Sequence, residues 1–282
     1  MSAWTPSSEQ DQISTLFDLG YFKGKEWDEV RSFMFRSPKV QQAIGQYEDF
    51  HRVVGEEPSE HMLRPRCGLP DFVRDPQEAA MSKWRIKDVT TSNRLSGLSP
   101  LSAEREQAAW LEAIAAWNAV CGIQMTFIDD MSKANIYANP GSTGPGVLAY
   151  SYLPNNSGPE DQMQQVYNRS TNWSYALLLN VIIHEIGHAI GLDHGPHGSI
   201  MQPTAAGDIL LPMAWDIEQA RIRYGSPDPK SPTPRTGFAM TVKSRISAGG
   251  CQLVPDVTDY DLDVATVIQP GRYRVVNEFQ MG

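Results

Sequence analysis

The segment HEIGHAIGLDH, residues 184–194, contains three of the six histidines of the chain. His184 and His188 are four residues apart, so on a helix both imidazoles lie on the same face, one turn apart. Gly191 can adopt the left-handed conformation that turns a chain out of a helix, which would bring His194 back beside the other two. Three neutral imidazoles are a typical ligand set for a catalytic zinc ion, whose fourth coordination position stays open. The segment therefore predicts one zinc site.

Glu185 gives this site a predicted reaction. It stands beside the first histidine and is not needed as a ligand. Zinc lowers the pKa of bound water and polarises a carbonyl group, while a neighbouring carboxylate accepts the water proton and passes it to a leaving amine. A bare HExxH arises by chance in unrelated chains, but Gly191 and His194 at their fixed spacings make coincidence much rarer. We therefore predict peptide-bond hydrolysis with Glu185 as general base.

The same segment matches the pattern HExxHxxGxxH of the metzincin peptidases, and SIMQP, residues 199–203, follows as the expected Met-turn. The proline of that turn and DIEQARIRYG, residues 216–225, resemble the matrixin family within this clan. The resemblance implies a matrixin-like catalytic domain of α+β fold, with a twisted mixed sheet and three helices. It also implies that Met201 forms an apolar floor beneath the histidines, a role compatible with ordinary core packing.

GVLAYSYLP, residues 146–154, resembles the edge strand of the family, along which substrate lies antiparallel through backbone hydrogen bonds. The resemblance implies substrate contacts at Leu148, Ala149 and Pro203, and a specificity pocket beside His188. An ordinary buried strand is the alternative interpretation, and both can hold together. Protein or peptide substrates are the expected partners.

PRCGLPD, residues 65–71, is similar to the cysteine switch of matrixin zymogens. A thiolate is a good zinc ligand, so Cys67 could occupy the fourth coordination position and keep the enzyme latent. The resemblance also implies that Arg66 and Asp71 pair to fix this segment. Activation would then require cleavage between about residues 72 and 81.

Composition and periodicity divide the chain into four predicted parts. The first, with apolar stripes at helical spacing, resembles the matrixin propeptide, which is akin to peptidoglycan-binding domains. His51 and His61 are interpreted as surface residues of this helical part, and His197 as a solvated loop residue. The four parts are a helical propeptide at 1–80, the catalytic domain at 81–225, a proline-rich linker at 226–236 and a small β-rich segment at 237–282.

Within the catalytic part, residue patterns predict three helices and several short strands. Residues 138–173 are rich in Gly, Pro, Asn and Ser, so loops are expected to dominate there. The predicted helices cover residues 103–120, with Ser102 as N-cap, 175–190 and 213–223. The predicted strands cover residues 83–89, 124–128, 134–137 and 147–152.

Matrixins of animals usually hold a second, structural zinc through histidines in the loop before the active-site helix. Residues 138–173 contain no histidine, and Tyr150 and Asn168 stand where ligands would be expected. Glu160 and Asp161 supply few oxygens for calcium. We predict one catalytic zinc and no structural zinc, and calcium binding is left open. Packing is expected to stabilise this loop instead, through Tyr150, Tyr152, Tyr167 and Trp173.

Charge and hydropathy exclude some partners. A net charge of −9 argues against nucleic acid, which attracts clustered Lys and Arg. No apolar run is long enough to span a bilayer, and no signal peptide is visible, although the resemblance implies an extracellular protein.

Two alternatives remain, a cell-wall-binding module with an auxiliary zinc domain and a self-processing protease of an assembly. The intact Glu185 favours an enzyme, because a pure binder has no use for a general base.

Overall fold

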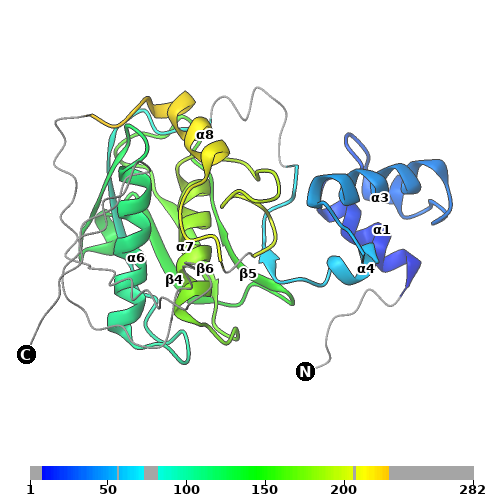
Figure 1. Ribbon diagram of the computed structural model, residues 1–282, viewed down its shortest axis with the longest axis horizontal. Coiled ribbons are helices and arrows are strands. Elements are labelled where there is room, and N and C mark those ends of the chain that lie inside the picture. The colour runs from blue at the N-terminus through cyan, green and yellow to red at the C-terminus, as the bar shows by residue number, and fades with distance from the viewer. Residues whose placement is uncertain (1–7, 56, 73–81, 206–207, 229–282) are drawn as a thin grey trace, which may run out of the picture. The chain divides into compact units, whose positions relative to one another are not determined.

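The computed structural model describes residues 8–55, 57–72, 82–205 and 208–228 (Figure 1). The predicted cleavage region from residue 73 onward lies outside the described residues. The same holds for the predicted linker from residue 229 and for the predicted C-terminal segment. The fourfold division of the chain therefore stays a prediction.

The N-terminal part is helical, as its apolar stripes predict (Figure 1). Ser8 caps the first helix by accepting a hydrogen bond from the backbone of Asp11, whose carboxylate accepts one from the backbone of Ser8. The buried side chains of this part form a core of their own, which includes Ile13, Leu16 and Val40. The helices are α1 (Glu9–Asp18), α2 (Trp27–Val30), α3 (Pro38–His51) and α4 (Pro58–His61).

The prediction that His51 and His61 are surface residues is wrong, because the two side chains are buried in the helical part. Val40, Ala43 and Tyr47 lie on the buried face of α3, and the same helical spacing places His51 on that face. His61 follows on α4, with its Nδ1 2.7 Å from the hydroxyl of Tyr47. The apolar stripe of α3 therefore continues into His51, and His61 packs nearby from α4.

A mixed six-stranded sheet forms the centre of the catalytic part, as predicted. Its order is β1-β5-β6-β4-β2-β3, and β5 and β6 are the antiparallel pair, whereas the other neighbours are parallel. The first strand comes from the predicted cysteine switch and joins the edge of the sheet at β5. The strands are β1 (Arg66–Cys67), β2 (Asp88–Asn93), β3 (Gln124–Phe127), β4 (Ile136–Gly141), β5 (Val147–Ser151) and β6 (Met163–Asn168).

Two long helices, α6 (Ala103–Asn118) and α7 (Tyr175–Ala189), lie side by side and pack against the sheet (Figure 1). Trp117 joins them by donating its indole N–H to the carbonyl of Ile183 at 2.9 Å. The predicted N-cap Ser102 is confirmed, since its hydroxyl accepts from the backbone N–H three residues on. A short 3-10 helix (Met131–Lys133) and α8 (Ala214–Tyr224) complete the described elements. The three predicted catalytic helices are thus confirmed.

Two strand predictions need correction. Residues 83–89 are mostly not a strand; β2 begins at Asp88, and Trp84 instead anchors the chain by donating its indole N–H to Ala189 O at 2.8 Å. The expectation of loops over residues 138–173 missed β6. The sequence of β6 is rich in polar residues and does not look like a buried strand. It is nevertheless a central strand, with β4 and β5 paired on its two sides, and Gln165 and Tyr167 are fully buried in it.

The aromatic residues expected to stabilise the loop region behave differently from one another. Tyr167 and Trp173 are buried, and their ring centroids lie 6.3 Å apart. Tyr150 and Tyr152 contact each other near the surface, and Tyr152 is 56% exposed. Packing by the first pair agrees with the expectation, whereas Tyr152 contributes little buried area.

Among the helices that the structure describes, none is long and apolar enough to cross a membrane.

Candidate active site

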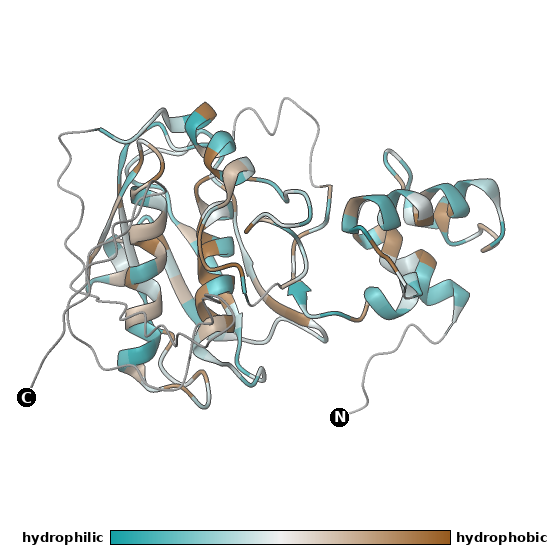
Figure 2. Cartoon of the chain, in the orientation of Figure 1, coloured by the Kyte–Doolittle hydropathy of each residue, from teal (hydrophilic) through white to brown (hydrophobic). Residues whose placement is uncertain are grey.

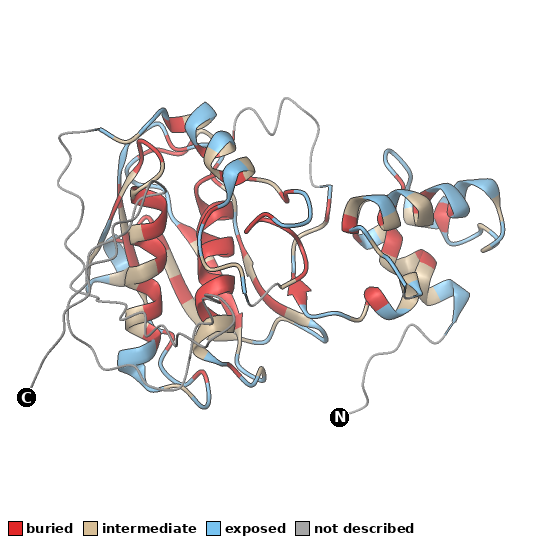
Figure 3. Cartoon of the chain, in the orientation of Figure 1, coloured by how far each residue is buried: buried red, intermediate tan, exposed pale blue. Residues whose placement is uncertain are grey.

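Helix α7 is buried along almost its whole length, yet it carries polar side chains. Figure 3 shows its turns mostly as buried, while Figure 2 shows apolar and polar residues along the same helix. His184, Glu185 and His188 are 5%, 0% and 0% exposed. Burying polar or charged groups is costly unless they find partners, so their position points to a functional site.

The three predicted zinc ligands meet in one place. The ring centroids of His184 and His188, one turn apart on α7, are 4.7 Å from each other, and that of His194 lies 5.4 and 4.8 Å from them. One ligand atom from each histidine and the sulfur of Cys67 all lie within 4.8 Å of one another. A single ion with ligand bonds of about 2.0–2.3 Å suits such a cluster.

Backbone carbonyls orient the three rings. His184 Nδ1 donates to Ile200 O at 2.8 Å, and His188 Nδ1 donates to Leu192 O at 2.7 Å. His194 Nδ1 donates at 2.8 Å to the carbonyl of Pro70, which belongs to the predicted switch. Because each Nδ1 carries the proton, each Nε2 presents its lone pair, the arrangement that metal-binding histidines adopt.

Gly191 allows the turn that brings the third histidine back. Its φ of 95° lies in the left-handed region, and a β-carbon would collide with the carbonyl of Ser82. Leu192 N donates to Gly187 O, and Gly191 N donates to His188 O, which closes the helix in a Schellman-like turn. The predicted structural role of Gly191 therefore has a direct physical basis.

Met201 packs closely against α7. It is fully buried, and a β-carbon at Gly187 would collide with its sulfur. Only a glycine on α7 permits this approach, so the Met201 side chain lies against the helix that carries the first two histidines. This placement agrees with the apolar floor that the resemblance implies.

Asp216, which the sequence analysis missed, holds the Met-turn from α8. Its carboxylate is buried and accepts hydrogen bonds from the backbone N–H groups of Ile200, Met201 and Met213, at 2.9, 3.2 and 2.7 Å. Met213 is three residues before Asp216, but Ile200 and Met201 are 16 and 15 residues away in the sequence. Sequence alone therefore offered only an acidic residue in the first turn of a helix as a signal.

Replacement of Asp216 by alanine is expected to lower the free energy of unfolding by about 3 kcal/mol, because buried N–H groups lose their acceptor. Urea unfolding monitored by tryptophan fluorescence measures this. Glu218→Ala, an exposed change on the same helix, is the matched control and should shift stability by less than about 0.5 kcal/mol. Equal effects of the two changes would show that Asp216 does not support the turn.

Gly195, the residue after His194, has no room for a side chain. A β-carbon there would collide with the ring of Trp215 and the hydroxyl of Ser199. The turn is nevertheless tied to the Met-turn, since Gly195 N donates to Met201 O at 2.8 Å. His197, two residues later, is exposed, as predicted.

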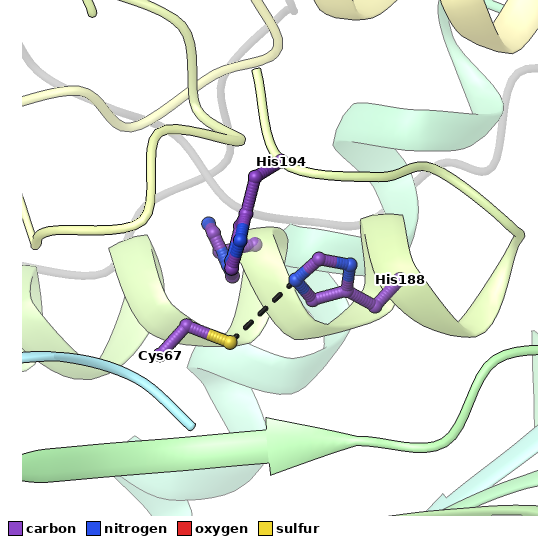
Figure 4. Close-up of side chains that lie close together, drawn as sticks. Cys67, His188 and His194 are labelled. Carbon is purple, nitrogen blue, oxygen red and sulfur yellow. Dashed lines mark hydrogen bonds between the residues drawn. The ribbon is translucent and has the colours of Figure 1, made fainter. Parts of the chain in front are cut away.

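The switch segment lies in the site, and its cysteine faces the histidines. Cys67 Sγ is buried and lies 3.5 Å from His188 Nε2 (Figure 4). Cys67 N donates to Pro203 O at 2.9 Å, and Gly68 N donates to Ala149 O at 2.8 Å. Burial and the nearby Glu185 carboxylate raise the pKa of the Cys67 thiol well above its usual value.

Two of the predicted substrate-contacting residues, Leu148 and Pro203, border a cavity of about 10 Å³ that also touches His184 and Glu185. This volume holds about one water molecule. The third, Ala149, is paired with the switch through its carbonyl. The lining of this cavity includes His184 and Glu185 of α7, and the specificity pocket expected beside His188 stays a prediction.

Burial sets the charge states of the titrating groups. It lowers the pKa of His184 to about 4 and that of His194 well below its usual value, so both rings are neutral near pH 7. It raises the pKa of Glu185 to about 8. Among the described residues, no hydrogen-bond partner is found for the Nε2 atoms of His184 and His194.

The donor set fits zinc. The unpartnered, buried Nε2 atoms of His184 and His194, the Nε2 of His188 and the sulfur of Cys67 are the nitrogen and sulfur ligands that zinc prefers. The glycine turn after the second histidine and the Met-turn beneath α7 complete the arrangement. Fold and site together define a tri-histidine metal centre of the metzincin type.

Comparison with known proteins relates the catalytic part to one family. Residues 83–213 match the family model described as Matrixin. This range contains the three histidines and the Met-turn. Over this segment the chain is similar to the matrixins.

Individual relatives agree with this. The chain is 30% identical over 196 residues to the neutrophil collagenase of Homo sapiens, covering 63% of this chain and 41% of the relative. It is 29% identical over 198 residues to matrix metalloproteinase-18 of Xenopus laevis, covering 62% and 40% of the two chains. It is 29% identical over 196 residues to the macrophage metalloelastase of Oryctolagus cuniculus, covering 62% and 41%. The match thus spans about two fifths of the length of these relatives.

Proposed function

We propose that this chain is a zinc-dependent endopeptidase kept latent by its own Cys67. The observation that carries the proposal is the convergence of three histidine ligand atoms and the Cys67 sulfur within 4.8 Å of one another, beside the buried carboxylate of Glu185. Bound zinc would supply Lewis acidity, lowering the pKa of a water and polarising the scissile carbonyl.

The residues of the chain take the remaining roles. His184, His188 and His194 hold the metal through Nε2, with backbone carbonyls fixing their rings. Glu185 accepts the proton of the attacking water and delivers it to the leaving amine. Burial raises the pKa of Glu185 to about 8, and the positive charge of a bound zinc would favour the ionised form that a general base requires.

Latency follows from the place of the switch segment. Its backbone pairs with β5 on one side and with Pro203 on the other, the surfaces where a substrate backbone is expected to bind. The segment runs parallel to β5, opposite to the direction expected for substrate. Cys67 therefore blocks the metal while its neighbours cover the expected substrate surface.

The substrates proposed are proteins or peptides in an extracellular setting, by analogy with the relatives. Two of the relatives are named as a collagenase and a metalloelastase, and casein is a suitable general probe for this chain. A single catalytic zinc, without a structural zinc, remains part of the proposal, and calcium binding is left open.

Zinc content tests the metal site. The full-length chain is expected to bind a single zinc. His188→Ala should weaken zinc binding by more than about 100-fold, because loss of a ligand should cost more affinity than loss of a residue that only hydrogen-bonds to a ligand. Zinc retention during titration with a chelator measures this, with circular dichroism to check folding. The exposed His197→Ala variant is the matched control and should retain zinc like the unmodified chain. Equal retention by both variants would refute the assigned ligands.

A further inference from the structure

Asp71, four residues beyond Cys67, fastens the switch segment at a second point, and its partners come from two different parts of the chain. Its side chain is fully buried. Oδ1 pairs with Arg66, a neighbour within the switch, as the family resemblance implies. Oδ2 instead accepts from the hydroxyl of Tyr21 at 2.9 Å and lies 2.8 Å from His51 Nε2. The switch therefore supplies partners for one oxygen only, and the helical part supplies those for the other.

The backbone strengthens this attachment. The N–H groups of Asp71 and Phe72 both donate to the carbonyl of Leu19, at 3.0 and 3.3 Å. The ring of Phe72 contacts Tyr21 and Phe50, with centroids 5.1 and 5.0 Å away. The end of the switch is thus packed and hydrogen-bonded to the segment that follows α1 and to α3.

The charge of Asp71 makes these donors important. Burial by itself would raise the pKa of Asp71, but the hydrogen bond from His51 and the charge of Arg66 outweigh burial, and the net pKa lies below its usual value. Asp71 is accordingly ionised near neutral pH. A buried carboxylate that loses a hydrogen-bond donor keeps its negative charge without the donor that stabilised it. This loss costs more free energy than the loss of a hydrogen bond between neutral groups.

Residues between Cys67 and Asp71 connect the contacts of Asp71 to the metal centre. Pro70, adjacent to Asp71, accepts the Nδ1 proton of His194 through its carbonyl. Leu69 N donates to Cys67 Sγ at 3.4 Å. A displacement of Asp71 would therefore pull on contacts to a metal ligand and to the blocking sulfur.

We propose that Tyr21, His51 and Asp71 form a latch that holds the Cys67 segment in the active site independently of the metal. The latch rests on the proposed function only in so far as Cys67 is the blocking group. The helical part then acts as an inhibitor through its own side chains and does more than carry the cysteine. Loosening these contacts would free the segment without any cleavage of the chain.

The test is the rate at which iodoacetamide alkylates Cys67 in the intact, full-length chain, followed by mass spectrometry of the peptide that contains Cys67. His51→Leu is expected to raise this rate about tenfold or more, because it removes a donor from a buried charge. His51→Gln, whose amide can replace the Nε2–H donor, should bring the rate back toward that of the unmodified chain. Tyr21→Phe, which keeps the ring and loses only the hydroxyl, should also accelerate alkylation.

Val40→Ala is the matched control, because it removes buried apolar atoms from the same helix as His51, and neither the valine nor the alanine side chain can form a hydrogen bond. All rates are measured with zinc and after its removal by a chelator. The latch predicts the same ratio between His51→Leu and the unmodified chain in both conditions, so the result can be interpreted even if the chain binds no zinc. If neither His51→Leu nor Tyr21→Phe exceeds Val40→Ala in the metal-free arm, the latch is refuted, whatever the chain does to peptides.

Discussion

Replacement of Glu185 by alanine is expected to lower kcat/KM for casein by about a hundred- to ten-thousandfold, the usual contribution of a positioned general base. The three histidines are unchanged in this variant, so bound zinc should remain. Burial raises the pKa of Glu185, and the hydrogen bond from the Cys67 thiol does not outweigh it, so removal of this carboxyl group should lower stability little. Loss of activity without loss of metal or fold is the expected combination.

This prediction is measured in chains that also carry Cys67→Ala, so that latency does not hide the effect. Zinc content and the midpoint of urea unfolding are recorded on the same samples. A Glu185→Ala variant that cleaves casein within a factor of about three of its parent would exclude Glu185 as the general base.

Replacement of Cys67 by alanine is expected to raise the activity of the uncleaved chain by about tenfold or more, equivalent to about 1.4 kcal/mol. The change removes the sulfur 3.5 Å from His188 Nε2 and leaves the fourth coordination position to water. The backbone pairs with Ala149 and Pro203 persist, so the variant should stay less active than the cleaved enzyme.

Initial rates of casein cleavage measure this effect, with mass spectrometry to confirm that the chain is intact. Cys121→Ala is the matched control, because Cys121 is equally buried but lies in the core, where its thiol contacts the carbonyl of Trp117. It should leave the chain latent. A Cys67→Ala chain as inactive as its parent, when the cleaved chain is active, would contradict inhibition by the thiol.

The helices could be predicted because their signals are local. Capping by Ser102 and the apolar spacing of α6 and α7 depend on residues within one or two turns, and the structure agrees closely with them. Strand β6 could not be found in this way. Gln165 is buried in it through pairing with two other strands, and such partners are distant in sequence.

The metal site was predictable for the same reason. His184, His188 and His194 fall within eleven consecutive residues, so a helix and a glycine turn suffice to bring them together. Cys67 is more than a hundred residues away, and only the resemblance of its segment to a known switch indicated its place. The structure brings it beside His188.

Residues that act across the fold were missed. Asp216 and His51 are ordinary polar letters in amphipathic helices, and their importance depends on which groups tertiary folding places opposite them. The surface position predicted for His51 overlooks its place on the apolar stripe of α3, which was a usable signal. A buried carboxylate such as that of Asp71 requires hydrogen-bond donors. That requirement could have directed attention to His51 as a donor.

Zinc K-edge X-ray absorption on the intact, full-length chain tests the latent metal site most directly. We expect three nitrogen ligands at about 2.0–2.1 Å and one sulfur ligand at about 2.3 Å, with the sulfur absent from the spectrum of the Cys67→Ala variant. A spectrum without sulfur in the unmodified chain would contradict inhibition by Cys67. A chain that takes up no zinc at all would contradict the proposed peptidase itself.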